Sequence, residues 1–124
     1  MTDLQVGAAK PAIVRVTIEH VAQVTPIFVA YSAFYGRTVA AAAAQQYLHE
    51  GVVTGESVIF MALTAEQQEA GGFLQMHPSR SSKWLGRRWI VNDIFVQPTL
   101  RRQHIGRRLL AAAQAHAVAT TAQD

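Results

Sequence analysis

Cysteine is absent from the sequence, and this removes several kinds of chemistry at once. Without thiols the chain cannot form disulfides, bind zinc through thiolates or use a cysteine nucleophile. The absence is compatible with a reducing compartment, and we expect a cytoplasmic protein. The five histidines lack the H-x-x-x-H spacing of a helical metal site, so we expect no metal ion.

Long apolar runs are also missing. No stretch of about 18 apolar residues occurs, so no membrane span is expected. The first residues, MTDLQVGAAKP, include an acidic residue, a lysine and a proline but lack the apolar segment of a signal peptide. Half of the 124 residues are apolar and 15% are charged, which favours a single folded domain over residues 1–124.

Charged residues are few, but those of one sign are concentrated. The formal net charge is +3, and eight of the eleven Lys and Arg residues lie between Arg80 and Arg108. This concentration favours an anionic partner for the surface that the segment forms.

The first half of the chain has the pattern of a strand followed by two helices. Residues 12–20 alternate apolar and polar side chains, as a half-buried strand does. Apolar residues then recur at three- and four-residue steps over 20–35, and Gly36 is placed to end this helix. Pro26 should kink the helix or mark its true start. Residues 38–51 are rich in alanine and end in glycine, which predicts a second helix.

The second half is predicted to be mostly strands, closed by a helix. We expect a strand at 57–64, a partner strand at 72–78, a polar loop at 79–87, a strand at 88–96 and a helix at 106–120. One face of that helix should carry Ile105, Leu109, Leu110, Ala113 and Ala117. The order β-α-α-β-β-β-α predicts an α/β (α+β) fold with a mostly antiparallel sheet.

The segment VQPTLRRQHIGRRLL, residues 96–110, runs from a strand through a basic turn into a helix. The first amides of a helix lack partners within it, and its dipole and nearby arginines attract phosphate. G-x-G-x-x-G and G-K-[ST] are absent, which excludes the dinucleotide and P-loop motifs. The arginines could also form a solvated face or a nucleic-acid recognition helix. A strand and a proline precede them instead of a second short helix, so we do not expect a nucleic-acid partner.

The pattern V-x-P-x-x-R-R-x-x-I-G-x-x-L-L in this segment resembles the acetyl-CoA signature of the GNAT family of N-acetyltransferases. In that family a strand ending in Val-x-Pro leads to Arg/Gln-x-x-Gly-x-Gly/Ala and a long helix. Upstream, GFLQMHPSRSS and WIVNDIFV are similar to the branch containing polyamine and histone acetyltransferases. The resemblance covers about Ile13 to Ala117. It implies a GNAT-like fold that lacks the family's C-terminal strand-helix-strand part, either by truncation or because a second copy completes the sheet in a homodimer.

The resemblance implies direct acetyl transfer from acetyl-CoA to a primary amine of a small molecule or peptide, in a ternary complex. An alkylammonium with a pKa near 10.4 is neutral in only about one part in ~10³ at pH 7, so deprotonation costs roughly 4–5 kcal/mol. A base, often acting through water, is therefore useful. The alternative is a truncated relative of weak or no activity that binds CoA or acts through dimer contacts.

The same resemblance implies where acetyl-CoA would lie. A backbone N–H within 94–96, in a strand that is often splayed by a bulge there, would stabilise the oxyanion, and amides within 101–107 would meet the pyrophosphate. His104 stands where the family has its first loop glycine, and Gly106 fills the second glycine position. The expected cofactor-binding residues are Ile94, Phe95, Val96, Arg101, Arg102, Gln103, His104, Ile105, Gly106 and Arg107.

Two residues inside the last strand are candidates for acceptor chemistry. Asp93 in an apolar strand is costly unless it is hydrogen-bonded. It could be a structural residue held by loop amides, or a catalytic residue that steers or deprotonates the amine. Asn92 would contact substrate, at the position where polyamine-specific relatives tend to carry a glutamate.

Aromatic residues supply the other acceptor candidates. Tyr31, Phe34 and Tyr35 have helical spacing and could simply pack in the core. In the family this region also lines the acceptor pocket, so Tyr31 is a substrate candidate and Tyr35 both a substrate and a catalytic candidate. Trp84 in the polar loop could cap the acceptor site or be a surface anchor.

Overall fold

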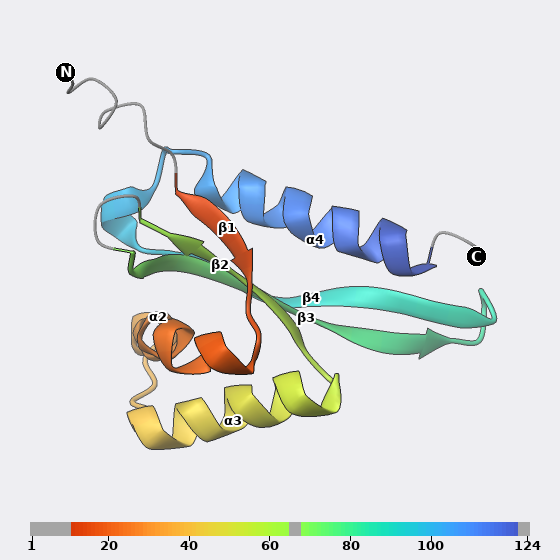
Figure 1. Cartoon of the computed structure of the whole chain (residues 1–124), viewed down its shortest axis with the longest axis horizontal. Coiled ribbons are helices and arrows are strands. Elements are labelled where there is room, and N and C mark those ends of the chain that lie inside the picture. Colours follow the sequence, from red (N-terminus) through yellow and green to blue (C-terminus); the bar gives the residue numbers. More distant parts are fainter. Residues whose placement is uncertain (1–10, 65–67, 122–124) are drawn as a thin grey trace.

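The computed structural model describes residues 11–64 and 68–121 (Figure 1). Its elements follow the predicted order β-α-α-β-β-β-α, with two short 3₁₀ turns added. They are β1 (Ala12–Arg15), η1 (Ile18–His20), α2 (Val21–Phe34), α3 (Ala41–Thr54), β2 (Val58–Leu63), β3 (Ala70–Ser81), β4 (Gly86–Val96), η2 (Pro98–Leu100) and α4 (Ile105–Thr121).

The strands form one antiparallel sheet in the order β1-β2-β3-β4, as predicted. Helix α4 covers one face, and α2 and α3 cover the other (Figure 1). Because both faces are covered, β2 is buried along its whole length, which is why it reads VIFMAL rather than alternating. None of the helices in the described ranges has the length and apolar character that crossing a bilayer requires.

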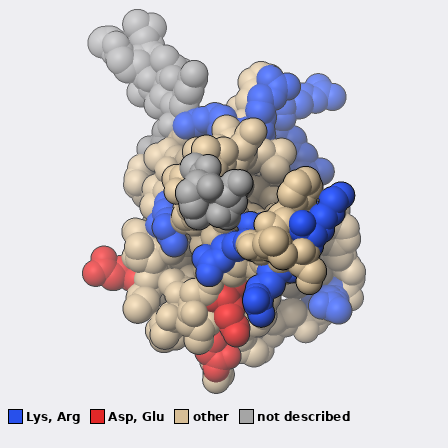
Figure 2. All heavy atoms as spheres, turned by 90° about the vertical axis from the view of Figure 1, so that its right-hand side faces the viewer, with Lys and Arg blue, Asp and Glu red and all other residues tan. Residues whose placement is uncertain are grey.

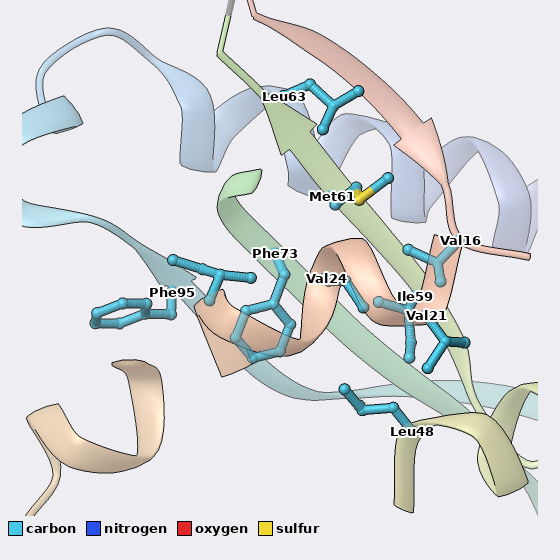
Figure 3. Close-up of a cluster of buried hydrophobic side chains, with 10 residues drawn as sticks. Val16, Val21, Val24, Leu48, Ile59, Met61, Leu63, Phe73 and Phe95 are labelled. Carbon is cyan, nitrogen blue, oxygen red and sulfur yellow. The ribbon is translucent and has the colours of Figure 1, made fainter. Parts of the chain in front are cut away.

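The core has two parts, one on each side of the sheet. Alternate residues of β2 point into different parts of the core. Ile59, Met61 and Leu63 face α2 and α3 (Figure 3). The intervening residues face α4, where Leu109 is fully buried. The prediction that Leu110 lies on the same helix face is wrong. Leu110 is about 100° around the helix from Leu109, and 47% of it is exposed.

The ends of the first elements differ in part from the prediction. Strand β1 ends at Arg15 rather than at residue 20, because the chain enters the turn η1 at Ile18. Pro26 lies inside α2, so it does not mark the start of that helix. Gly36 lies directly after the C-cap of α2, with φ of 85°, and this prediction is confirmed.

Helix α3 is shifted relative to its predicted range, beginning at Ala41 and ending at Thr54. Its C-cap is Gly55, with φ of 79°, and Gly51 lies inside the helix. Gly51 has a packing role instead: a Cβ at this position would lie 2.6 Å from Ser57 Oγ. Glycine therefore lets the Ser57 side chain lie directly against the helix.

The predicted polar loop at 79–87 is largely a hairpin. Strand β3 continues to Ser81 and β4 begins at Gly86, so only four residues form the turn. The hairpin projects beyond β1 and β2 (Figure 1), and Lys and Arg side chains gather on the face of the molecule at this end (Figure 2). Arg80 lies directly opposite Arg87 in the strand register. Like charges in this arrangement repel each other across the hairpin.

We expect Arg80→Glu to raise the free energy of unfolding by about 0.2–1 kcal/mol, because it replaces a repulsive cross-strand pair with an attractive one. Urea denaturation at low salt measures the change. Arg88→Glu is the matched control, because Arg88 lies opposite Ser79 and has no like-charged partner in register. An equal gain in the control, or no gain in Arg80→Glu, would show that the repulsion is negligible.

Candidate functional site

A bulge in β4 determines where its polar residues point. Gln75 lies opposite Asp93, but the next residue of β3, Met76, lies opposite Val91, so Asn92 is an extra residue without a partner in register. Because strand side chains alternate between faces, one extra residue reverses the faces on its two sides. The bulge therefore turns Asp93 toward α2. It lies within the strand where a bulge was expected, just before residues 94–96.

Contacts on either side of the bulge show this reversal. Upstream, Trp89 Nε1 donates a hydrogen bond of 2.8 Å to Thr120 Oγ1 of α4. Downstream, the ring of Phe95 lies on the other face, 5.8 Å from the ring of Tyr31 in α2 between centroids. One half of β4 thus packs against α4, and the other half packs against α2.

The Asp93 carboxylate is held by side chains. Tyr31 donates its hydroxyl to Oδ1 at 2.5 Å. Gln75 Nε2 donates to Oδ2 at 2.6 Å, and Asn92 Nδ2 donates to the same oxygen at 3.2 Å. The loop-amide partners considered from the sequence are therefore not the ones that bind this carboxylate. The hydrogen bond to Asp93, with burial and the negative charge adding to it, raises the pKa of Tyr31 to about 12.

A groove of about 560 Å³ lies between α2, α3 and β4, beside this carboxylate. Tyr31, Tyr35, Asn92 and Asp93 line it, so the structure brings these acceptor candidates together. Tyr35 is 66% exposed, so the core packing considered for it is wrong. Tyr47 of α3 also lines the groove and was missed in the sequence, because its helix carried no other chemical signal.

A second groove, of about 440 Å³, follows the end of β4 and the start of α4. All of the predicted cofactor-binding residues except Gln103 line it. Tyr35 lines this groove as well as the first one, so the two grooves meet at Tyr35.

The loop between η2 and α4 has an unusual backbone path that leaves several amides without a carbonyl partner in the part of the chain that the structure describes. Arg102 and His104 have left-handed φ values of 73° and 63°, which non-glycine residues rarely adopt. Among the described residues, the first backbone N–H after Arg101 to donate to a carbonyl is that of Arg108, to His104 at 3.0 Å. The intervening amides are available to a ligand, at the positive end of the α4 dipole.

Strand β4 also offers backbone groups to this groove. The N–H of Gln97 donates to the carbonyl of Gly71 at 2.9 Å, which fixes the alternation along the end of the strand. The N–H and C=O groups of Ile94 and Val96 therefore point away from β3. In the described sheet β4 is the last strand, so these groups face the groove.

Arg101 connects the loop to α2. Its Nε donates to the carbonyl of Val96 at 3.0 Å. Its guanidinium carbon lies 5.3 Å from the ring centroid of Phe34 and 5.7 Å from that of Phe95. These contacts place the charge beside the junction of the two grooves. Phe34, like Tyr35, is exposed at this junction and does not pack in the core.

Gly106 is not required by the fold of the protein itself. Its φ is not left-handed, and the nearest atom to a Cβ built there would be Val96 Cγ2 at 4.0 Å. The absence of a side chain instead leaves the floor of the groove open to close approach from outside.

Of the predicted site residues, Gln103 lies in the loop without lining either groove, and Trp84 lies away from all the others. It lies in the hairpin turn, is 65% exposed and lines neither groove.

Gln75 and Ser57 belong to the hydrogen-bonded cluster around Asp93, but they were not predicted from the sequence. Ser57 Oγ donates to Gln75 Oε1 at 2.9 Å. A glutamine inside an apolar strand is the same signal that singled out Asp93, and it could have identified Gln75.

The chain matches the family described as "Acetyltransferase (GNAT) family" over residues 25–123. It is similar to YhfO of Bacillus subtilis (strain 168), called an uncharacterized N-acetyltransferase, with 38% identity over 77% of this chain and 63% of that protein. A probable acetyltransferase of Haemophilus influenzae is 33% identical over 72% of this chain and 60% of its own length. The chain thus spans about three fifths of the length of these relatives.

Solved structures share the fold. The crystal structure of a probable acetyltransferase superposes with a TM-score of 0.79 and 40% identity, over 86% of this chain and 70% of that one. An aminoglycoside acetyltransferase from a soil metagenome, crystallised with sisomicin, gives a TM-score of 0.72 over 89% of this chain and 71% of its own. At 16% identity, the second likeness concerns the fold alone.

We expect the Tyr31 phenol to titrate near pH 12, as the difference in absorbance between the wild type and Tyr31→Phe. Asp93→Asn should lower this pKa toward the ordinary value of 10.0, because it removes the charge and the strong acceptor. Since folding raises the pKa, the contribution to stability is complete below about pH 10 and is lost as the pH rises toward 12. An unchanged titration in Asp93→Asn would contradict the hydrogen bond as the main cause.

Proposed function

The chain belongs to the GNAT acetyltransferase family, and we propose from this that it transfers an acetyl group from acetyl-CoA to a primary amine of a small molecule or peptide. The observation that carries the proposal is the meeting of two chemically different grooves at Tyr35. The groove at the start of α4, which we call the cofactor groove, has free amides and arginines suited to phosphates. The groove between α2, α3 and β4, which we call the acceptor groove, has a carboxylate suited to an ammonium group.

The residues of the cofactor groove fit acetyl-CoA. The amides that follow Arg101 would bind the pyrophosphate, with Arg102 and Arg107 adding charge at the rim of the groove. The outward N–H groups of Ile94 and Val96 would stabilise the oxyanion and, with the carbonyl of Ile94, hold the extended pantetheine. The Val96 carbonyl already accepts from Arg101. The open space at Gly106 supports this fit, since no protein atom uses it.

The residues of the acceptor groove fit an amine. Asp93 would attract the ammonium form and accept its proton, directly or through water. Tyr31 is an unsuitable base, because its raised pKa keeps the phenol neutral near pH 7. Its role is to donate to Asp93, while the exposed Tyr35 contacts both substrates where the grooves meet. No metal ion enters this proposal.

A second candidate function is CoA binding with little or no transfer. The observation that favours it is His104. This residue places an imidazole in the loop between η2 and α4, at a left-handed position where glycine would be unstrained. In this case the grooves would still bind CoA, and the chain would act through contacts with a second copy or another protein.

Two measurements on the whole chain separate these functions. Calorimetric titration with CoA tests the cofactor groove alone, and thiol release from acetyl-CoA with a panel of primary amines tests transfer. Binding together with amine-dependent thiol release supports the enzyme. Binding without release from any amine supports the second function, and the absence of CoA binding contradicts both.

We expect Gly106→Ala to weaken CoA binding by about tenfold, equivalent to about 1.4 kcal/mol, because the new methyl group occupies the open floor of the groove. The same change should leave the fold intact and stabilise the free protein by up to about 1 kcal/mol, because alanine favours a helix more than glycine does. Calorimetry and urea denaturation of the same variant test both statements. Unchanged CoA affinity would show that the cofactor does not approach this residue.

We expect His104→Gly to have the opposite effect on binding. Glycine adopts the left-handed φ without strain and allows closer approach of the pyrophosphate, so the fold should persist and CoA should bind more tightly. His104→Ala is the control, because it removes the imidazole but keeps the Cβ. Calorimetry showing unchanged or weaker binding for His104→Gly, or equal tightening for the control, would contradict this explanation.

A further inference from the structure

Gln75 is a polar residue in a position where the fold would otherwise use an apolar one. It lies in the middle of β3 between Leu74 and Met76, and only 2% of its surface is exposed. A buried amide is costly unless its donors and acceptor are bonded. Both ends of this amide have partners: Nε2 donates to Asp93 Oδ2, and Oε1 accepts from Ser57 Oγ.

These two hydrogen bonds fix the orientation of the amide. An ionised carboxylate only accepts hydrogen bonds, so the Gln75 nitrogen has to face Asp93. The hydroxyl of Ser57 then supplies the donor that the amide oxygen needs. Ser57 itself is confined by Gly51, since even a Cβ at that glycine would approach its Oγ to 2.6 Å. The cluster is thus anchored at α3 and ends at the acceptor groove.

The two carboxylate oxygens of Asp93 accept hydrogen bonds from different elements. Oδ1 accepts from Tyr31 on α2, and Oδ2 accepts from Gln75 on β3. Rotation of the carboxylate would break both short hydrogen bonds at once. The third donor, Asn92, is adjacent in sequence, is exposed and bonds at 3.2 Å, so it constrains the rotation less.

We propose that Gln75 is a positioning residue of the acceptor site, which holds the Asp93 carboxylate in the orientation that presents it to the amine. This inference rests on the proposed function for its catalytic consequence. Its structural part, the control of Asp93 by Gln75, stands on the hydrogen bonds alone. Gln75 acts through Asp93, and Ser57 acts through Gln75.

The structural part is tested by titrating the Tyr31 phenol in Gln75→Leu, again as the difference from the same protein carrying Tyr31→Phe. If Gln75 holds the carboxylate, Asp93 turns toward solvent in the variant and the pKa of Tyr31 falls below the wild-type value. If Gln75 only competes with Tyr31 for Asp93, its loss strengthens the remaining hydrogen bond, and an unchanged or higher pKa overturns the proposal.

The catalytic part is tested by amine-dependent thiol release. In Gln75→Leu we expect kcat to fall by about 10- to 100-fold, the size of effect seen when a reacting group is slightly misplaced. The KM for acetyl-CoA should stay within about twofold, because Gln75 does not line the cofactor groove. An unchanged kcat, or an equal loss in kcat and in acetyl-CoA affinity, would overturn the positioning role.

Two further variants keep the test decisive. Ser57→Ala leaves the Gln75 donor but removes its anchor, and we expect smaller changes in the same directions. Met76→Leu introduces the same residue at a neighbouring position on the opposite face of β3, and it should alter neither the Tyr31 titration nor kcat. If Gln75→Leu does not fold, Ser57→Ala carries the test. If no amine supports transfer in the wild type, the proposed function fails, but the Tyr31 titration still decides whether Gln75 controls Asp93.

Discussion

The bulge at Asn92 is the constraint on which both grooves depend. A regular β4 would present the same alternation along its whole length, and the face that binds α4 through Trp89 would also carry Asp93. One additional residue lets the upstream half of the strand pack against α4 while the downstream half carries Asp93 and Phe95 toward α2. The hydrogen bonds of Asp93 with Tyr31 and Gln75 follow from this reversal, and so does the ring contact between Phe95 and Tyr31.

The two ends of the site are built from different materials. At the start of α4 the polar groups without a protein partner in the described ranges are backbone N–H groups, which follow an unusual path through Arg102 and His104. In the acceptor groove the polar groups are side chains that hold one another, with Asp93 as the shared acceptor. The second arrangement depends more on the short hydrogen bonds from Tyr31 and Gln75 than on the longer one from Asn92.

Local patterns in the sequence predicted the order of elements and the basic turn before the last helix, because helix periodicity, strand patterning and turn composition are short-range signals. They did not predict which of two glycines ends a helix. Gly36 does, whereas Gly51 continues its helix and packs against Ser57, which directly precedes the next strand. The hairpin at 79–87 was missed for a similar reason, since the ladder that orders it pairs residues from two strands and polar composition alone indicated a loop. The partners of Asp93 depend on register and on the bulge, and neither is encoded within one segment.

The contact between Gly51 and Ser57 has an evolutionary consequence. It is the first in a series of adjacent pairs that continues through Gln75 to Asp93, so these positions form one mutational unit. A substitution at Gly51 would be tolerated in some sequence backgrounds and harmful in others, depending on whether Ser57 and Gln75 are present. Among homologues that keep a carboxylate at position 93, we therefore expect the other three positions to covary, although the glycine itself lines neither of the two grooves.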